Sequence, residues 1–217
     1  MKLNLIKITI KELLRYGVHI GYSKQYLNNQ IKPYLVGFRG QFNIFNVKPI
    51  KYQLKTLLYL ITNLAAKRQS LLLINHYKES LSLSNTFRMK RCYVLEGFWL
   101  GGFLTNFKTI RLYTDYMTKD TNPLLKNFNS LPSLLIFLNT TTANWGVREG
   151  LNLNIPLAVA TGSNYNLLNK TIYPLVASNE TTEAQSFYIN LIKRALIRGF
   201  HQEKLRVIPL KKKKKNY

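Results

Sequence analysis

Short apolar runs alternate along the chain with longer segments whose apolar residues recur every three or four positions. The short runs are typical of strands that are buried on both faces. They predict strands over residues 34–38, 42–47, 70–75, 92–95, 133–139, 155–160 and 172–176. The longer segments predict helices over residues 6–15, 49–67, 78–90, 140–151 and 182–198. Residues 21–30 are polar and predict a loop.

Local residue types mark the boundaries of several of these elements. Arg39-Gly40-Gln41 separates the first two strands and predicts a β-hairpin. Pro174 has no N–H to donate, so the last strand is expected at a sheet edge or in an irregular position. Thr140 to Thr142 can cap the helix that follows them, and Gly199 is expected to end the last helix.

The order of the elements predicts the fold class. Strands alternate with helices from residue 49 onward, which indicates a mostly parallel sheet with helices on both faces, a doubly wound α/β fold. We expect one domain over residues 1–200. A basic C-terminal tail over residues 201–217 would need RNA to become ordered.

The charge balance restricts the partners. Lys and Arg number 32 and Asp and Glu only 9, so the formal net charge is +23. Such an excess repels itself unless an anionic partner neutralises it, and nucleic acid or an anionic membrane surface would do so. The basic residues are spread along the chain, whereas a peripheral membrane binder gathers them on one amphipathic helix. The pattern therefore favours nucleic acid, and no apolar stretch is long enough to predict a membrane span.

The sequence offers little catalytic chemistry. It has neither a dinucleotide-binding glycine fingerprint nor a phosphate-binding loop motif, and Gly101-Gly102 predicts only a tight turn. The histidines are not at metal-ligand spacing, and the single cysteine, Cys92, is expected to be a small buried hydrophobic residue. We expect no metal, no cofactor and no small-molecule substrate. The alternative is an enzyme with its site near His76 and Thr140 to Thr142, where predicted strands end.

Aromatic residues stand beside cations in several places, as nucleic-acid-binding proteins require. The pairs are found in Lys32-Pro33-Tyr34, Phe38-Arg39, Phe107-Lys108 and Arg111-Leu112-Tyr113. Rings of this kind stack on unpaired bases while the cations bind phosphates. The same rings also fill protein cores, and Trp99 in particular is expected in the core or against another protein.

Three segments resemble the universal small-subunit ribosomal protein S2 family. They are LLRYGVHIGY (13–22), IKPYLVGFRGQFNIFNV (31–47) and WLGGFLTNFKTIR (99–111), the last being the family's most distinctive motif. A weaker match continues through residues 133–139, 147–149 and 155–156 to the final helix. The matches occur in the family's order.

The resemblance implies a flavodoxin-like fold on the solvent side of the small subunit, near the junction of head and body. It implies binding to ribosomal RNA and to neighbouring ribosomal proteins, with no catalytic role. From charge and motif position we expect the RNA phosphates to be contacted by Lys24, Lys32, Arg39, Lys108, Arg111, Lys211, Lys212, Lys213, Lys214 and Lys215.

The chain departs from the bacterial pattern of the family at several places. Arg15 stands in place of a glutamate, Tyr22 in place of a histidine and Phe98 in place of an arginine. Thr161-Gly162-Ser163 replaces Asp-Thr-Asn, and residues 176–179 lack a Pro-Gly-Asn-Asp run. About twenty residues separate Arg111 from Ser133, so the long charged helical hairpin of bacterial members is expected to be missing.

These departures and the composition suggest an organellar branch. The chain has 22 asparagines and is rich in Lys, Ile, Tyr and Phe, residues that have A/T-rich codons. We expect a mitochondrially encoded protein of mitochondrial translation, with a plastid origin as the alternative. An organellar RNA chaperone or splicing factor remains the alternative function.

Overall fold

The main sheet of the protein has five parallel strands, and its order identifies the fold. The computed structural model describes residues 6–75, 91–96, 99–110, 128, 130–139 and 144–207. The strands are β4 (Leu71–Asn75), β5 (Cys92–Glu96), β6 (Leu134–Phe137), β7 (Leu157–Thr161) and β8 (Tyr173–Val176). They lie side by side in the order β5-β4-β6-β7-β8, which is the flavodoxin-like arrangement.

The strands form where the apolar runs predicted them. Every residue of β4, β6 and β7 is buried, as expected for strands covered on both faces. Leu72 pairs with Tyr93 of β5 on one side and with Leu135 of β6 on the other. β8 lies at an edge of the sheet, so the position inferred from Pro174 is confirmed.

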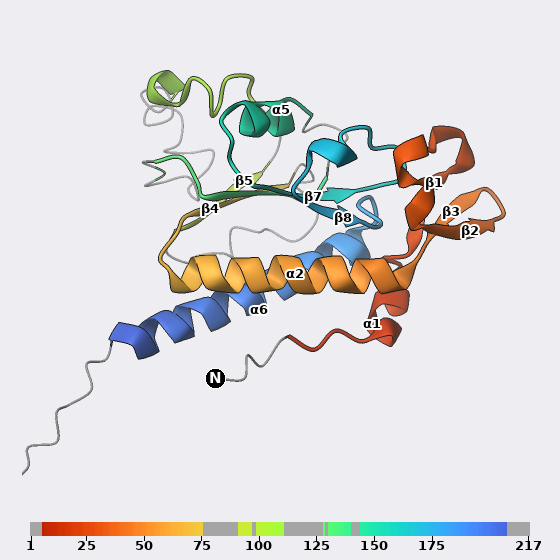
Figure 1. Ribbon diagram of the computed structural model, residues 1–217, viewed down its shortest axis with the longest axis horizontal. Coiled ribbons are helices and arrows are strands. Elements are labelled where there is room, and N and C mark those ends of the chain that lie inside the picture. The colour runs from red at the N-terminus through yellow and green to blue at the C-terminus, as the bar shows by residue number, and fades with distance from the viewer. Residues whose placement is uncertain are drawn as a thin grey trace, which may run out of the picture.

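Helices cover both faces of this sheet, which confirms the doubly wound α/β prediction. Figure 1 shows α2 (Val47–Ala66) and α6 (Thr182–Val207) on one face and α5 (Asn144–Asn152) on the other. α2 begins at Asn46, whose Oδ1 accepts the Lys48 N–H at 3.1 Å. Its predicted extent, 49–67, is therefore correct to within two residues at each end.

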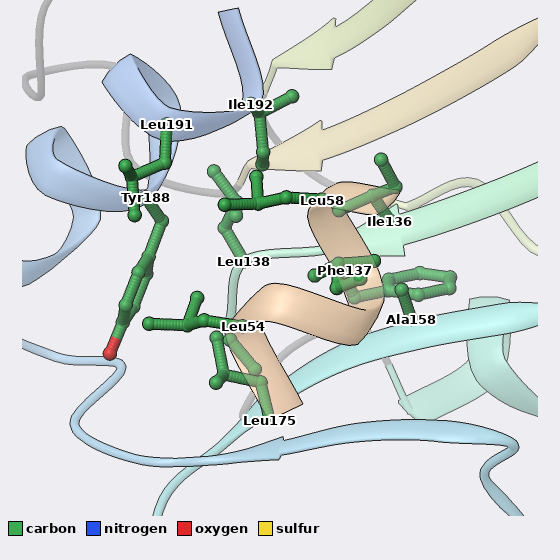
Figure 2. A pocket seen from close by; sticks show the side chains of 12 residues that line it. Leu54, Leu58, Ile136, Phe137, Leu138, Ala158, Leu175, Tyr188, Leu191 and Ile192 are labelled. Carbon is green, nitrogen blue, oxygen red and sulfur yellow. The ribbon is translucent and has the colours of Figure 1, made fainter. Parts of the chain in front are cut away.

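The layer between the sheet and the two long helices is closely packed and apolar. Figure 2 shows Leu54 and Leu58 of α2 and Leu191 and Ile192 of α6 beside the apolar side chains of the strands. Among the residues drawn, the one polar side-chain atom is the hydroxyl of the fully buried Tyr188, which donates to the Ser178 carbonyl at 2.7 Å. This layer is a core and offers no space for a ligand.

Gly199 does not end α6, and the prediction that it does is wrong. The helix continues eight residues further, to Val207. A Cβ at Gly199 would lie 2.5 Å from the Ala65 Cβ and 2.5 Å from the Thr62 carbonyl oxygen, both on α2. The glycine therefore allows two helices to cross closely. From the sequence alone, a glycine with this role cannot be distinguished from one that ends a helix.

A second, antiparallel sheet is formed by the N-terminal part of the chain. Its strands, in the order β1-β3-β2, are β1 (Ile20–Ser23), β2 (Leu35–Arg39) and β3 (Phe42–Phe45). The β2–β3 hairpin confirms the prediction, whereas the loop expected over 21–30 is instead β1 followed by the 3-10 helices η1 (Lys24–Tyr26) and η2 (Asn29–Tyr34). A third, η4 (Leu168–Lys170), precedes β8.

The first helix is shorter than predicted. α1 (Ile10–Arg15) begins four residues after the expected start, because the Thr9 side chain accepts the Glu12 N–H and the Glu12 carboxylate accepts the Thr9 N–H. This capping box fixes where the helix starts. Several predictions lie outside the described residues. They are the helix over 78–90, the absence of the bacterial hairpin between Arg111 and Ser133, the cap at Thr140 to Thr142 and the block Lys211–Lys215.

Candidate RNA interface

The WLGGFLTNFKTIR motif forms a tight turn that is held by one buried carboxylate. Glu149 of α5 is 8% exposed. Its Oε1 accepts the Trp99 indole N–H at 2.9 Å and the Gly102 N–H at 2.8 Å. Its Oε2 accepts the N–H groups of Leu104 at 2.9 Å and Thr105 at 3.2 Å. Four donors from one turn therefore converge on a single side chain.

These hydrogen bonds keep Glu149 ionised although it is buried. Desolvation alone would raise the pKa of the carboxyl group, but the bonds from Trp99, Leu104, Gly102 and Thr105 outweigh it and hold the pKa below its usual 4.5. The carboxylate thus accepts hydrogen bonds from N–H groups of the turn that have no backbone acceptor. The sequence placed Glu149 only in the weaker family match over residues 147–149 and predicted no role for it.

Aromatic rings pack against the same turn. Trp99 packs edge-on against Phe103, with ring centroids 5.2 Å apart, and against Phe137 of β6 at 5.9 Å. A Cβ at Gly146 of α5 would come within 2.7 Å of the indole, so only glycine admits it there. Trp99 is therefore a packing residue, which confirms that interpretation of the sequence.

Lys108 is presented to solvent at the end of this turn. Gly102, with φ +83°, turns the chain, and a helical turn over 107–110 follows. Phe107 packs against Phe128 at 5.2 Å, while Lys108 next to it is exposed. Arg111, the other cation expected from this motif, lies outside the described residues.

The second group of expected cations lies on the antiparallel sheet. The Lys24 ammonium is 4.7 Å from the centre of the Phe38 ring, and the Lys24 N–H donates to the Gln41 carbonyl at 2.8 Å. Arg39 pairs with Phe42 across the hairpin. Both rings are about half exposed, Phe38 at 54% and Phe42 at 53%. Cations and rings are thus side by side at this surface, an arrangement that is able to stack unpaired bases and contact phosphates.

Lys32 belongs to the 3-10 helix that leads into this hairpin. It is exposed on η2, whereas Ile31 beside it is fully buried and anchors the helix. Asn28 Oδ1 caps the helix by accepting the Gln30 N–H at 2.9 Å. In Figure 1 the antiparallel sheet lies at the right and the turn 99–110 at the upper left, so the described cations lie at two separate places, Lys24, Lys32 and Arg39 at the first and Lys108 at the second.

Ser163 joins the two sheets, and it belongs to a departure from the bacterial pattern. Its hydroxyl accepts the Tyr22 N–H at 3.1 Å and an amide N–H of the buried Asn43 at 3.0 Å, and its carbonyl accepts the Asn28 N–H at 2.8 Å. A Cβ at Gly162 would collide with the Tyr22 ring. Two departures noted separately in the sequence, at Tyr22 and at 161–163, are therefore in direct contact.

The remaining candidates are the cysteine, a possible metal site and the strand ends near His76. Cys92 is buried, which raises the pKa of its thiol to about 12 and confirms it as a core residue. Across the described ranges, no group of three His, Cys, Asp or Glu side chains is placed to hold a metal ion. His76 and Thr140 to Thr142, on which the enzyme alternative rests, are outside these ranges. None of the described helices is long and apolar enough to cross a membrane.

Comparisons of the sequence with known proteins find small-subunit ribosomal proteins. The chain is similar to the small ribosomal subunit protein uS2 of Acidiphilium cryptum, with 26% identity over 90% of this chain and 88% of that protein. The uS2 proteins of Gluconobacter oxydans and Rickettsia typhi are 26% and 25% identical, cover 90% of this chain, and are themselves covered over 84% and 76%.

The family profile described as ribosomal protein S2 matches residues 13–124, just over half of the chain. The matched region contains the β2–β3 hairpin, α2 and the turn that Glu149 holds. The chain therefore belongs to the ribosomal protein S2 family, whose members are structural proteins and not enzymes.

Proposed function

We propose that the protein is a structural constituent of the small ribosomal subunit, where it binds ribosomal RNA and neighbouring ribosomal proteins. The observation that carries this proposal is membership of the ribosomal protein S2 family over residues 13–124. The relatives it matches are named small ribosomal subunit proteins. The chain's own electrostatics give independent support.

The basic residues have almost no acidic partners within the protein. No Asp or Glu occurs between Glu12 and Glu79, a stretch that includes the 3-10 helices η1 and η2, the hairpin and α2. Among the described residues the one ion pair joins Arg68 to Glu203 at 2.6 Å. A protein of net charge +23 with its cations unpaired requires external anions, and phosphates supply them.

The two groups of cations would touch separate RNA segments. We assign phosphate contacts to Lys24, Lys32 and Arg39 at the antiparallel sheet, and to Lys108 and Arg111 at the turn. Lys211, Lys212, Lys213, Lys214 and Lys215 would follow a further RNA segment beyond α6. Binding at separate surfaces suits a structural protein that holds several RNA segments together.

We assign the protein to mitochondrial translation. Three features support a mitochondrial origin. They are the abundance of residues that have A/T-rich codons, the replacement of bacterial motif residues at Tyr22 and 161–163, and the short segment between Arg111 and Ser133. A plastid ribosome is the alternative, and the compartment in which a tagged copy of the protein is found separates the two.

Sedimentation of an organelle lysate, followed by sequencing of the RNA that co-purifies with the chain, tests the function. We expect the protein to sediment with the small subunit and to recover its ribosomal RNA. A free pool that carries introns or messenger RNA would instead identify an RNA chaperone or splicing factor. A protein absent from ribosomal particles and indifferent to polyanions would overturn the proposal.

A further inference from the structure

A groove runs between the segment that leads into α1 and the outer side of α2. It has a volume of about 560 Å³ and is lined by residues 6–10, Lys51 and Lys55. α2 lies at the front of Figure 1, with α1 below its first turns. The groove is on the helix layer that covers one face of the main sheet, whereas the turn carrying Lys108 packs against α5 on the other face.

The charges around the groove are positive and unpaired. Lys7, Lys51 and Lys55 line it, and none of them lies within ion-pair distance of a carboxylate in the described part of the chain. Glu12, at the far end of this segment, is engaged by the Thr9 N–H at 2.8 Å and the Thr9 hydroxyl at 2.7 Å. Among the described residues, no carboxylate therefore forms a direct ion pair with these lysines, and the charge of Lys7 acts on Glu12 only as a minor contribution to its lowered pKa.

The position of these lysines on α2 is unfavourable without an external anion. Lys51 and Lys55 are four residues apart and thus neighbours on one helix face, where like charges repel. Lys48 stands in the first turn, which has no acidic residue, and there the helix dipole disfavours a cation. A phosphate beside this half of the helix would relieve both effects.

An aromatic ring stands among the same lysines. Tyr52 is 74% exposed, more than any other large hydrophobic side chain in the described part of the chain. On the helix it is next to Lys51 and lies one turn from Lys48 and Lys55. An exposed ring flanked by cations is the arrangement by which proteins bind single-stranded RNA, because an unpaired base stacks on the ring while phosphates meet the cations.

We propose that this surface of α2, formed by Lys48, Lys51, Tyr52 and Lys55, binds a single-stranded segment of RNA. The backbone lies along the groove against Lys51 and Lys55, and one base stacks on Tyr52. A duplex would leave the ring unused, because its bases are already stacked. A protein partner fits less well, because lysine is depleted at the centres of such interfaces. The inference rests on the proposed function and adds a site on the opposite helix layer from Lys108.

Salt-dependent binding of the full chain to a short single-stranded RNA of mixed sequence tests the site. The double change Lys51→Gln and Lys55→Gln should reduce the magnitude of the salt slope by about 1.4, since each phosphate contact contributes about 0.7 on a single strand. The matched control, Lys67→Gln with Lys204→Gln, removes two exposed charges at the far ends of α2 and α6 and should leave the slope unchanged.

Tyr52 provides a second, independent measurement. Tyr52→Ala should weaken binding by about 5- to 150-fold, the loss expected when one stacked base is released, with the salt slope unchanged. Tyr52→Phe keeps the ring and should bind the RNA as tightly as the wild type does. An alanine variant that binds as tightly as the wild type would remove the stacked base from the proposal.

Chemical acetylation of the wild-type protein avoids any variant that fails to fold. With the same RNA bound, Lys51 and Lys55 should be protected while Lys67 reacts as before. Equal reactivity with and without RNA overturns the groove site, and it leaves the proposed function standing if the protein still binds RNA. Protection by phosphatidylglycerol vesicles but not by RNA would also overturn it, in favour of a membrane surface.

Discussion

The indole N–H of Trp99 donates a 2.9 Å hydrogen bond to Glu149, a residue fifty positions later in the chain. The same carboxylate accepts N–H groups of Gly102, Leu104 and Thr105. One of the few acidic residues of this strongly basic protein thus stabilises the conformation of one turn. That turn carries Lys108, so the geometry of a proposed RNA contact depends on α5.

Replacing Glu149 with glutamine should destabilise the protein. The amide keeps one oxygen acceptor but points an NH₂ group at two of the N–H donors, whichever way it is oriented. Leaving such buried groups unpaired costs about 1–3 kcal/mol. Thermal unfolding at neutral pH checks this, with Glu183→Gln on an exposed helix start as the control. A variant as stable as the wild type would show that the turn holds without the charge.

Gly199→Ala should also destabilise the protein, although alanine favours helices. The new methyl group would meet Ala65 and the Thr62 carbonyl of α2 at 2.5 Å, so the two helices must separate. Overpacking of this kind costs about 1–3 kcal/mol, against a gain of about 1 kcal/mol in helix propensity. Gly101→Ala, where a Cβ meets nothing within 4 Å, is the control. A raised melting temperature for Gly199→Ala would mean that the crossing is looser than described.

The sequence was sufficient for the main sheet because its strands are uninterrupted apolar runs. β4, β6 and β7 were found within two residues of their bounds for this reason. The sequence also predicted α2, because the apolar residues of the helix recur with a regular period. These signals are local, and they do not depend on which other element the residue contacts.

The features that the sequence did not predict depend on distant partners. In the sequence Gly199 predicts a helix end, and its role follows only from its contact with Ala65. Glu149 is one isolated acidic residue in the sequence, and its role follows only from the folded turn at Gly102. The cations of the hairpin were found because rings stand beside them in the sequence. Lys51 and Lys55 were not, because an amphipathic helix normally exposes lysines, and only the groove beside residues 6–10 distinguishes them.

His19 should make the protein less stable as the pH falls. Burial, and to a lesser degree the charge of Arg39, hold the pKa of His19 below its usual 6.5, and its Nδ1 has no hydrogen-bond partner among the described residues. The unfolded chain therefore binds a proton at higher pH than the folded protein does. Stability should fall as the pH drops from about 7 through the lowered pKa. His19→Gln should flatten this dependence in unfolding titrations, and an identical profile would contradict it.

Changing Lys108 and Arg111 to alanine should weaken RNA association and flatten its salt dependence. Lys108 is exposed beside the packed ring of Phe107, so its removal leaves the turn intact. The loss of two phosphate contacts on a single strand should reduce the slope by about 1.4. Competition against the wild type for the same RNA measures it. An unchanged slope would remove both residues from the interface.

The hairpin cations allow the sharpest comparison with the groove. Lys24→Gln with Arg39→Gln removes two charges that lie beside the exposed rings of Phe38 and Phe42. If the hairpin and the α2 groove bind different RNA segments, this pair should lower the salt slope on small-subunit RNA, and adding Lys51→Gln and Lys55→Gln should lower it further by a similar amount. Sites that do not contact each other are additive, whereas a shared phosphate is lost only once. A quadruple variant with the same salt slope as the hairpin pair would therefore contradict a separate RNA segment at the groove.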